Sequence, residues 1–89
     1  MRAIITVTGK DHTGIVASVS KKLADVQVNI LDISQTLMEE YFTMILLCDF
    51  TSSPHSIPEV REQMKEIEAE EKLVVRIQSE EIFNAMHTL

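Results

Sequence analysis

The sequence lacks the features that mark secreted and membrane proteins. Its only cysteine is Cys48, so no disulfide can form within the chain. The amino terminus has no basic segment followed by an apolar one, as a signal peptide would. Apolar runs such as Ile45–Cys48 have the length of a strand and fall far short of a membrane span. We therefore expect a cytoplasmic protein that does not contact membranes.

Basic residues are also scarce. Eight lysines and arginines stand against 14 acidic residues, which gives a net charge of −6, and the acids concentrate between Glu59 and Glu71. An acidic chain without a basic stripe is poorly suited to bind nucleic acid directly. With 89 residues the chain has room for one domain, and it buries only somewhat more than ~60% of its unfolded surface. We expect a partner chain to add burial.

Period-two and helical patterns alternate along the chain and predict four strands and three helices. Alternating and β-branched apolar residues predict strands over residues 2–8, 28–38, 41–50 and 73–78. Apolar residues at helical spacing predict one helix that ends near Asp25, a second that follows Ser56 and a short third from Ser79 onward. The stripe of the third helix consists of Ile82, Phe83, Met86 and Leu89.

Local signals place the helix starts. Thr13 is the expected N-cap of the first helix, after a turn over residues 9–12. Ser56 and Glu59 have the spacing of a capping box, with Pro58 in the first turn of the second helix. These signals agree with the apolar periodicity that follows each of them.

The element order βαββαβ predicts an α+β, ferredoxin-like fold. Right-handed crossovers place two helices on one face of a four-stranded antiparallel sheet, and the short C-terminal helix follows. Glu39-Glu40 is a short connection, so strands 28–38 and 41–50 should form a hairpin. Strand 41–50 is apolar on both faces, which is typical of a central strand. The other sheet face needs a cover: a second copy, the C-terminal helix, or both.

The segment Gly9–Gly14 joins the first strand to the first helix and is the main candidate for a site. Its glycines have the spacing of a P-loop, but Ile15 stands where the phosphate-binding lysine belongs. Two interpretations stay open: a tight turn only, or a loop whose free helix N–H groups bind a small anion or carboxylate. Asp11 would either bind an ammonium group or cap the helix.

Other polar residues give weaker signals. Asn29 is either a turn residue or a ligand contact with one donor and one acceptor. His12 is the one histidine beside a polar cluster, and the histidines have no spacing that suggests a metal site. No serine or cysteine has the context of a nucleophile, and Cys48 alternates with core residues. We expect no enzymatic activity, no metal and no cofactor.

Two stretches of sequence resemble the ACT domain, a regulatory module of amino-acid metabolism. They are AIITVTGKDHTGIV (residues 3–16) and VNILDISQT (residues 28–36). The segments YFTM (41–44) and EIFNAMH (81–87) are similar to small standalone ACT proteins, and the chain also resembles the ACT repeats of the glycine-cleavage repressor and of formyltetrahydrofolate deformylase. The resemblance implies an ACT domain over residues 1–78, with residues 79–89 as a C-terminal helical extension.

The resemblance also implies where a ligand would bind. In amino-acid-binding ACT domains the ligand lies at a homodimer interface, between the first strand–helix loop of one chain and the start of the second strand of its neighbour. By position, the ligand-binding residues would be Lys10, Asp11, His12, Thr13, Gly14 and Ile15 of one chain and Asn29 and Ile30 of the other. This chain departs from the serine-binding pattern: Gly9 stands in place of a histidine and Asp11 in place of an asparagine.

Two functions follow as hypotheses. The first is a non-catalytic ACT-type regulatory module that binds a small metabolite, an amino acid, at a homodimer interface, within a dimer or a higher oligomer, and reports it to an effector protein. The alternative is a protein–protein interaction module without a small ligand, which docks through the sheet edge or the apolar stripe of the C-terminal helix.

Overall fold

The computed structural model describes residues 1–87 and confirms the βαββαβ order with a C-terminal helix. Leu89, expected on the apolar stripe of that helix, lies outside the described residues. The elements are β1 (Arg2–Lys10), α1 (Ile15–Asp25), β2 (Asn29–Met38), β3 (Tyr41–Asp49), α2 (Ile57–Glu71), β4 (Leu73–Ser79) and α3 (Glu80–His87). Among residues 1–87, no helix is long and apolar enough to cross a membrane.

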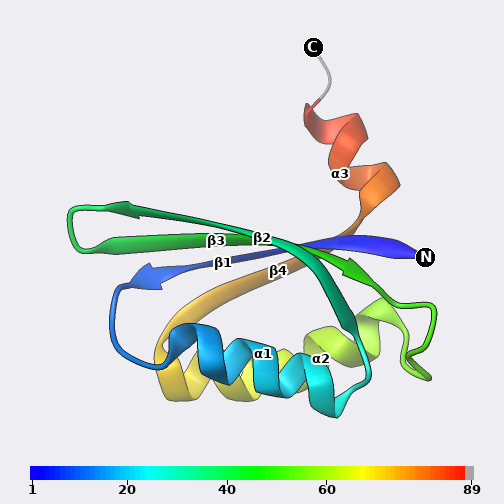
Figure 1. Cartoon of the computed structure of the whole chain (residues 1–89), viewed down its shortest axis with the longest axis horizontal. Helices are drawn as coiled ribbons and strands as arrows, with labels where there is room; N and C mark the ends of the chain where they lie inside the picture. Colours follow the sequence, from blue (N-terminus) through cyan, green and yellow to red (C-terminus); the bar gives the residue numbers. More distant parts are fainter. Residues whose placement is uncertain (88–89) are drawn as a thin grey trace.

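The four strands form one antiparallel sheet in the order β2-β3-β1-β4. The predicted hairpin is present, and β3 is an inner strand, as its two apolar faces indicated. In Figure 1 the sheet is seen nearly edge-on, with α1 and α2 on one side and α3 on the other. The predicted capping box is also present: Ser56 and Glu59 bond each other at the start of α2.

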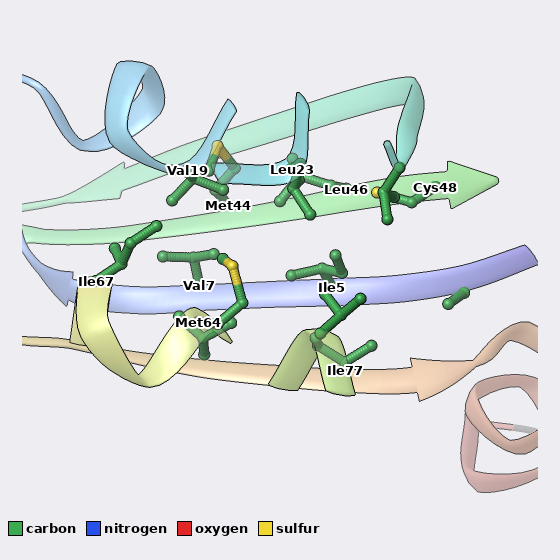
Figure 2. Close-up of a cluster of buried hydrophobic side chains, with 14 of the residues drawn as sticks. Ile5, Val7, Val19, Leu23, Met44, Leu46, Cys48, Met64, Ile67 and Ile77 are labelled. Atoms are coloured by element: carbon green, nitrogen blue, oxygen red, sulfur yellow. The ribbon is translucent and has the colours of Figure 1, made fainter. Parts of the chain in front are cut away.

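The core lies between the sheet and the two helices α1 and α2 (Figure 2). Alternate residues of the inner strands meet apolar residues of the helices, and the fully buried ones include Ile5, Val7, Val19, Leu23, Met44, Leu46 and Met64. Cys48 is buried among them, as predicted, and burial raises the pKa of its thiol to about 11. The thiol therefore stays protonated at neutral pH and acts as a small hydrophobic group.

Two predictions near the first loop were wrong. The strand β1 does not end at Thr8 but continues through Gly9 to Lys10, because both residues pair with β3. A Cβ on Gly9 would come within 2.7 Å of Leu73 Cδ2 and 3.1 Å of the Lys72 carbonyl oxygen. Gly9 is therefore needed for the close approach of β4 rather than for a turn.

The second wrong prediction is the N-cap of α1. The N-cap is Gly14 and not Thr13, and it has a φ of 96° in the left-handed region. A β-branched threonine is strained at such a φ, whereas glycine adopts it freely. No side chain bonds to the start of α1 in the described part of the chain, so the cap contributes only backbone geometry.

Candidate functional site

The loop between β1 and α1 presents backbone donors. The first hydrogen bond of α1 runs from the Ser18 N–H to the Gly14 carbonyl, at 2.9 Å. The N–H groups of the three preceding residues, from Ile15 to Ala17, therefore have no acceptor within the helix. The Ile15 side chain is buried in the core, while Thr13 and Gly14 are exposed. The positive end of the helix dipole thus faces solvent, in a form that suits a small carboxylate.

Asp11 lies in this loop and does not cap α1. Its N–H donates to the Glu40 carbonyl at 2.8 Å, which fastens the loop to the β2–β3 turn. Its side chain is exposed and has no bonding partner among residues 1–87. Of the two roles considered for Asp11, the structure removes helix capping and leaves the carboxylate accessible to a ligand.

His12 joins the loop to the end of α2. Its Nδ1 lies 3.0 Å from the Lys10 carbonyl oxygen, and its Nε2 lies 2.6 Å from Glu71 Oε2. The other carboxylate oxygen of Glu71 accepts a hydrogen bond from Ser18 Oγ at 3.0 Å. A carbonyl can only accept, so Nδ1 carries a proton, and a carboxylate opposite Nε2 favours a second proton there.

The electrostatics of this pair follow from the geometry. The hydrogen bond that His12 donates to Glu71, followed by the one it donates to the Lys10 carbonyl, raises the pKa of His12 above its ordinary value. The hydrogen bonds from His12 and then Ser18 hold the pKa of Glu71 below its ordinary value. The imidazolium–carboxylate pair is therefore the state that this geometry favours near neutral pH.

Sequence reasoning did not identify Glu71 and Ser18 as neighbours of the loop. A signal was present in the topology, because β4 runs antiparallel to β1 and Leu73 lies opposite Gly9. The end of α2 must therefore come beside the end of β1. The residue spacing alone, 59 positions between His12 and Glu71, gives no indication of the contact.

A groove of about 380 Å³ lies beside the loop. Its walls carry charges of both signs, from Lys10, His12, Glu70, Glu71 and Lys72. Pockets for small molecules begin at about 300 Å³, so the groove has room for a ligand the size of an amino acid. Charges of both signs suit a zwitterion, which carries a carboxylate and an ammonium group.

Asn29 and Ile30 lie far from the loop within one chain. Asn29 pairs with Asp49, which pairs with Arg2, whereas Lys10 lies at the opposite end of β1. Eight strand residues at about 3.3 Å each separate these two levels, roughly 26 Å. Asn29 is exposed and Ile30 packs against the core. A single chain thus does not bring the two halves of the predicted site together.

No metal centre is evident in the part of the chain that the structure describes. No group of three histidine, cysteine or acidic side chains lies close enough together there to hold an ion.

Comparison with known proteins assigns the family. The sequence model of the ACT domain matches residues 2–78. The chain belongs to the ACT domain family. A UPF0237 protein of Corynebacterium glutamicum is 54% identical over 89 residues, which is all of both chains. The resemblance noted in the sequence is thereby confirmed.

Solved structures support the same assignment. An ACT domain protein from Streptococcus pneumoniae superposes with a TM-score of 0.81 at 39% identity, covering 100% of this chain and 97% of that one. A putative glycine cleavage system transcriptional repressor superposes with a TM-score of 0.75 at 23% identity, over 86% of this chain and 44% of that one. The second match shows a shared fold.

Proposed function

We propose that this ACT domain is a non-catalytic, cytoplasmic regulatory module that binds a small metabolite, an amino acid, between two copies of the chain. One observation carries the proposal. The donor-rich loop and Asn29 are at opposite ends of the same sheet, and a two-fold axis at the edge strand β2 would bring each loop beside the partner's Asn29.

The register makes this pairing specific. Because β2 is an edge strand, a partner's β2 can add to it in antiparallel fashion. Pairing centred on Gln35 sets Asn29 of the partner subunit two residues beyond the level of Tyr41, which lies opposite Lys10, and so at the level of the loop that follows Lys10. Each dimer would then contain two equivalent sites, each built from both chains.

The chemistry of the site fits an amino acid. The free N–H groups at the start of α1 would bind the ligand carboxylate, helped by the helix dipole. The accessible Asp11 carboxylate and the side-chain oxygen of the partner's Asn29 would accept hydrogen bonds from the ammonium group. Lys10, His12 and Thr13 would line the entrance on the loop side.

Regulation follows from a site shared by two chains. A ligand that contacts both chains binds the dimer better than the monomer, so binding and assembly stabilise each other reciprocally. An effector protein that recognises the dimer would then respond to the concentration of the ligand. No catalytic group is required at any step.

Thermal unfolding against a panel of free amino acids tests this function. A ligand at a hundred times its Kd adds about 2.7 kcal/mol of stability, which raises the Tm measurably. We expect one member or a small group to raise it, and we expect Asp11→Ala and Asn29→Ala to abolish the shift. Glu62→Ala, on the outer side of α2, is the control that should keep it. A flat panel with an intact dimer would contradict the proposal.

A protein-docking function is the second candidate. Ile82 and Met86 lie one turn apart on α3 and are 56% and 63% exposed. Such apolar exposure on a terminal helix suits a groove in another protein. If removal of residues 79–89 leaves every captured partner bound, this function is excluded. If the amino-acid panel is flat and the truncation releases a partner, it replaces the first.

A further inference from the structure

The side of the sheet opposite α1 and α2, here called the open face, is a surface to which neither the core nor the candidate site assigns a role. Three rows of side chains cross it, in the order β2, β3, β1 and β4: Asp32, Leu47, Ile4, Gln78; then Ser34, Ile45, Thr6, Arg76; then Thr36, Thr43, Thr8, Val74. Ile45 is 39% and Val74 51% exposed. α3 packs only at one end of the face, against β1 and β4, and stands away from the sheet (Figure 1).

The charges of the chain are unevenly divided between the two sides of the sheet. Six of the 14 acids belong to α2, which lies on the side away from the open face. The rows of the open face carry one acid, Asp32, and one base, Arg76, and Lys72 lies at the start of β4. α3 begins with Glu80 and Glu81 at the opposite end. Within residues 1–87, Lys72, Arg76 and Glu81 form no ion pair, although Glu80 bonds Arg2 at 2.9 Å.

We propose that the open face binds the open face of a second copy of this chain, about a two-fold axis perpendicular to the strands. The axis would cross the face between the Thr6 and Thr8 rows. Each strand then lies over its own copy in the opposite direction, because a two-fold interface is self-complementary. The acidic helices α2 of both chains remain on the outer surfaces, so the stacked faces avoid their mutual repulsion.

The rows are partly complementary under this rotation, which also sets Ile4 over the partner's Lys10 and Asp32 over the partner's Met38. Leu47 lies over Tyr41 of the partner subunit, Ile45 over the partner's Thr43, and the stem of Arg76 over the partner's Val74. Leu47 and Tyr41 therefore bring apolar area together, the stem of Arg76 adds apolar contact with a valine, Ile45 meets a threonine, and the Arg76 guanidinium reaches the sheet edge and stays in water. Sheets that pack in this way lie about 10 Å apart.

The same rotation gives α3 a contact. The start of the partner's β4 comes over the end of β4, where α3 begins. Glu81 then faces the partner's Lys72, and the side of α3 with Ile82 and Met86 faces the partner's Val74. The unpaired charges of α3 and of the start of the partner's β4 are thus of opposite sign, and their exposed apolar side chains meet. Each contact occurs twice in the symmetric pair.

The area explains why α3 takes part. Strands about 4.8 Å apart and about 26 Å long give the sheet a planar footprint of roughly 500 Å² per chain. Stable interfaces bury about 800 Å² per partner. The planar footprint of the face falls short of this value, so contacts made by the exposed apolar residues Ile82 and Met86 of α3 would add to the buried area.

Stacking is compatible with pairing through β2. The two-fold axis of the β2 pairing passes beside Gln35, which lies between the Ser34 and Thr36 rows. The stacking axis crosses the sheet between these same rows, so the two axes cross. Two perpendicular two-fold axes that cross give a closed assembly of four chains rather than a filament. The stacking proposal does not depend on the ligand, and it can fail while the proposed function stands.

Sedimentation equilibrium tests the stack. We expect the wild-type protein to reach four chains of 10.1 kDa each at micromolar concentration. Ile45→Glu, which puts a charge near the axis on an exposed face, should halve the mass without unfolding the chain. Glu62→Lys, on the outer side of α2, should leave it unchanged. The proposal would be wrong if the wild-type protein forms no particle larger than two chains and Ile45→Glu leaves the mass of that particle unchanged.

Mixing two variants that each carry one added, exposed cysteine locates the contact. Cys48 is buried, so Ile82→Cys and Val74→Cys each offer one reactive thiol. We expect a disulfide-linked dimer only when the two variants are mixed and oxidised. Mixing Ile82→Cys with Glu62→Cys is the control for random collision. If the 82–74 mixture cross-links no faster than the control, α3 does not meet the partner's β4 and the proposed axis is wrong.

Discussion

The two edges of the sheet differ in how their backbone groups are occupied. On β4, the Val75 N–H donates to Glu68 Oε2 at 3.1 Å, and the Ile77 carbonyl accepts from Arg61 Nη2 at 3.1 Å. On β2, the Ile33 N–H is the one backbone group with such a partner within residues 1–87, namely the carboxylate of its neighbour Asp32 at 2.9 Å. Gln35 and Leu37 repeat the orientation of Ile33, and no side chain among residues 1–87 bonds their backbone.

This difference indicates where another chain can add. An unpaired strand edge is a template for further pairing, and proteins close such edges with side chains, bulges or helices. α2 packs along β4 and closes that edge with one acid and one arginine. β2 has a bulge between Ile30 and Asp32 near its start, and the rest of its edge is open. The chain therefore directs edge pairing to β2.

The largest expected effect comes from closing the open edge. Gln35→Pro removes the outward N–H at the centre of the proposed pairing and so deletes two interchain hydrogen bonds per dimer. At roughly 1 kcal/mol each, the loss is about 2 kcal/mol, or about thirtyfold weaker association. Sedimentation over a concentration series measures this change. Gln35→Ala keeps the N–H and should associate normally; equal weakening by both variants would place the interface elsewhere.

An intermediate effect is expected from opening the closed edge. Glu68→Ala leaves the Val75 N–H without its acceptor and should cost roughly 1 kcal/mol in the free energy of unfolding. Urea denaturation measures the loss, with Glu70→Ala on the same helix as the control. The variant should also gain concentration-dependent association through β4. Unchanged stability and unchanged mass would show that Glu68 does not protect this edge.

The smallest effect concerns the ion pair between His12 in the loop and Glu71 at the end of α2. The pKa of His12 is raised, so its contribution to stability is complete below 6.5 and is lost as the pH rises through the raised value. The pKa of Glu71 is lowered, so its contribution is complete above 4.5 and is lost as the pH falls through the lowered value. The stability difference between wild type and His12→Ala should therefore be greatest between these limits.

Denaturation at a series of pH values measures that difference. His55→Ala is the matched control, because His55 Nδ1 lies 3.5 Å from Glu59 Oε2, a much longer contact than that of His12. A His12→Ala difference that stays constant from pH 5 to pH 9 would show that the contact does not depend on the imidazolium.

Sequence periodicity predicted the fold well because the core is built from regular patterns. The alternation in β1 and β3 and the helical stripe of α1 each reflect one buried face, and these faces meet in the structure. The predicted strand 28–38 and the observed β2 differ by a single residue. A periodic pattern that reflects the burial of one face of a strand or helix can therefore be predicted from the sequence.

The details of the loop were less predictable because they depend on contacts between distant segments. The N-cap was assigned to Thr13 from residue preference, but the chain uses the left-handed φ of Gly14 instead. The His12–Glu71 contact depends on how β4 approaches β1, which no local pattern encodes. The residues of the candidate site were chosen by resemblance, and only their placement at the two ends of the sheet comes from the structure.

The packing at Gly9 has a consequence for how ligand preference can change. The serine-binding pattern has a histidine at this position, but any side chain here meets Leu73 Cδ2 and the Lys72 carbonyl oxygen. A single exchange at position 9 would therefore disrupt the junction of β1 and β4 before it created a new ligand contact. A smaller residue at position 73 would relieve the contact with Cδ2 but not the one with the Lys72 backbone oxygen, so that specificity also requires the start of β4 to move away from β1 by a few tenths of an ångström.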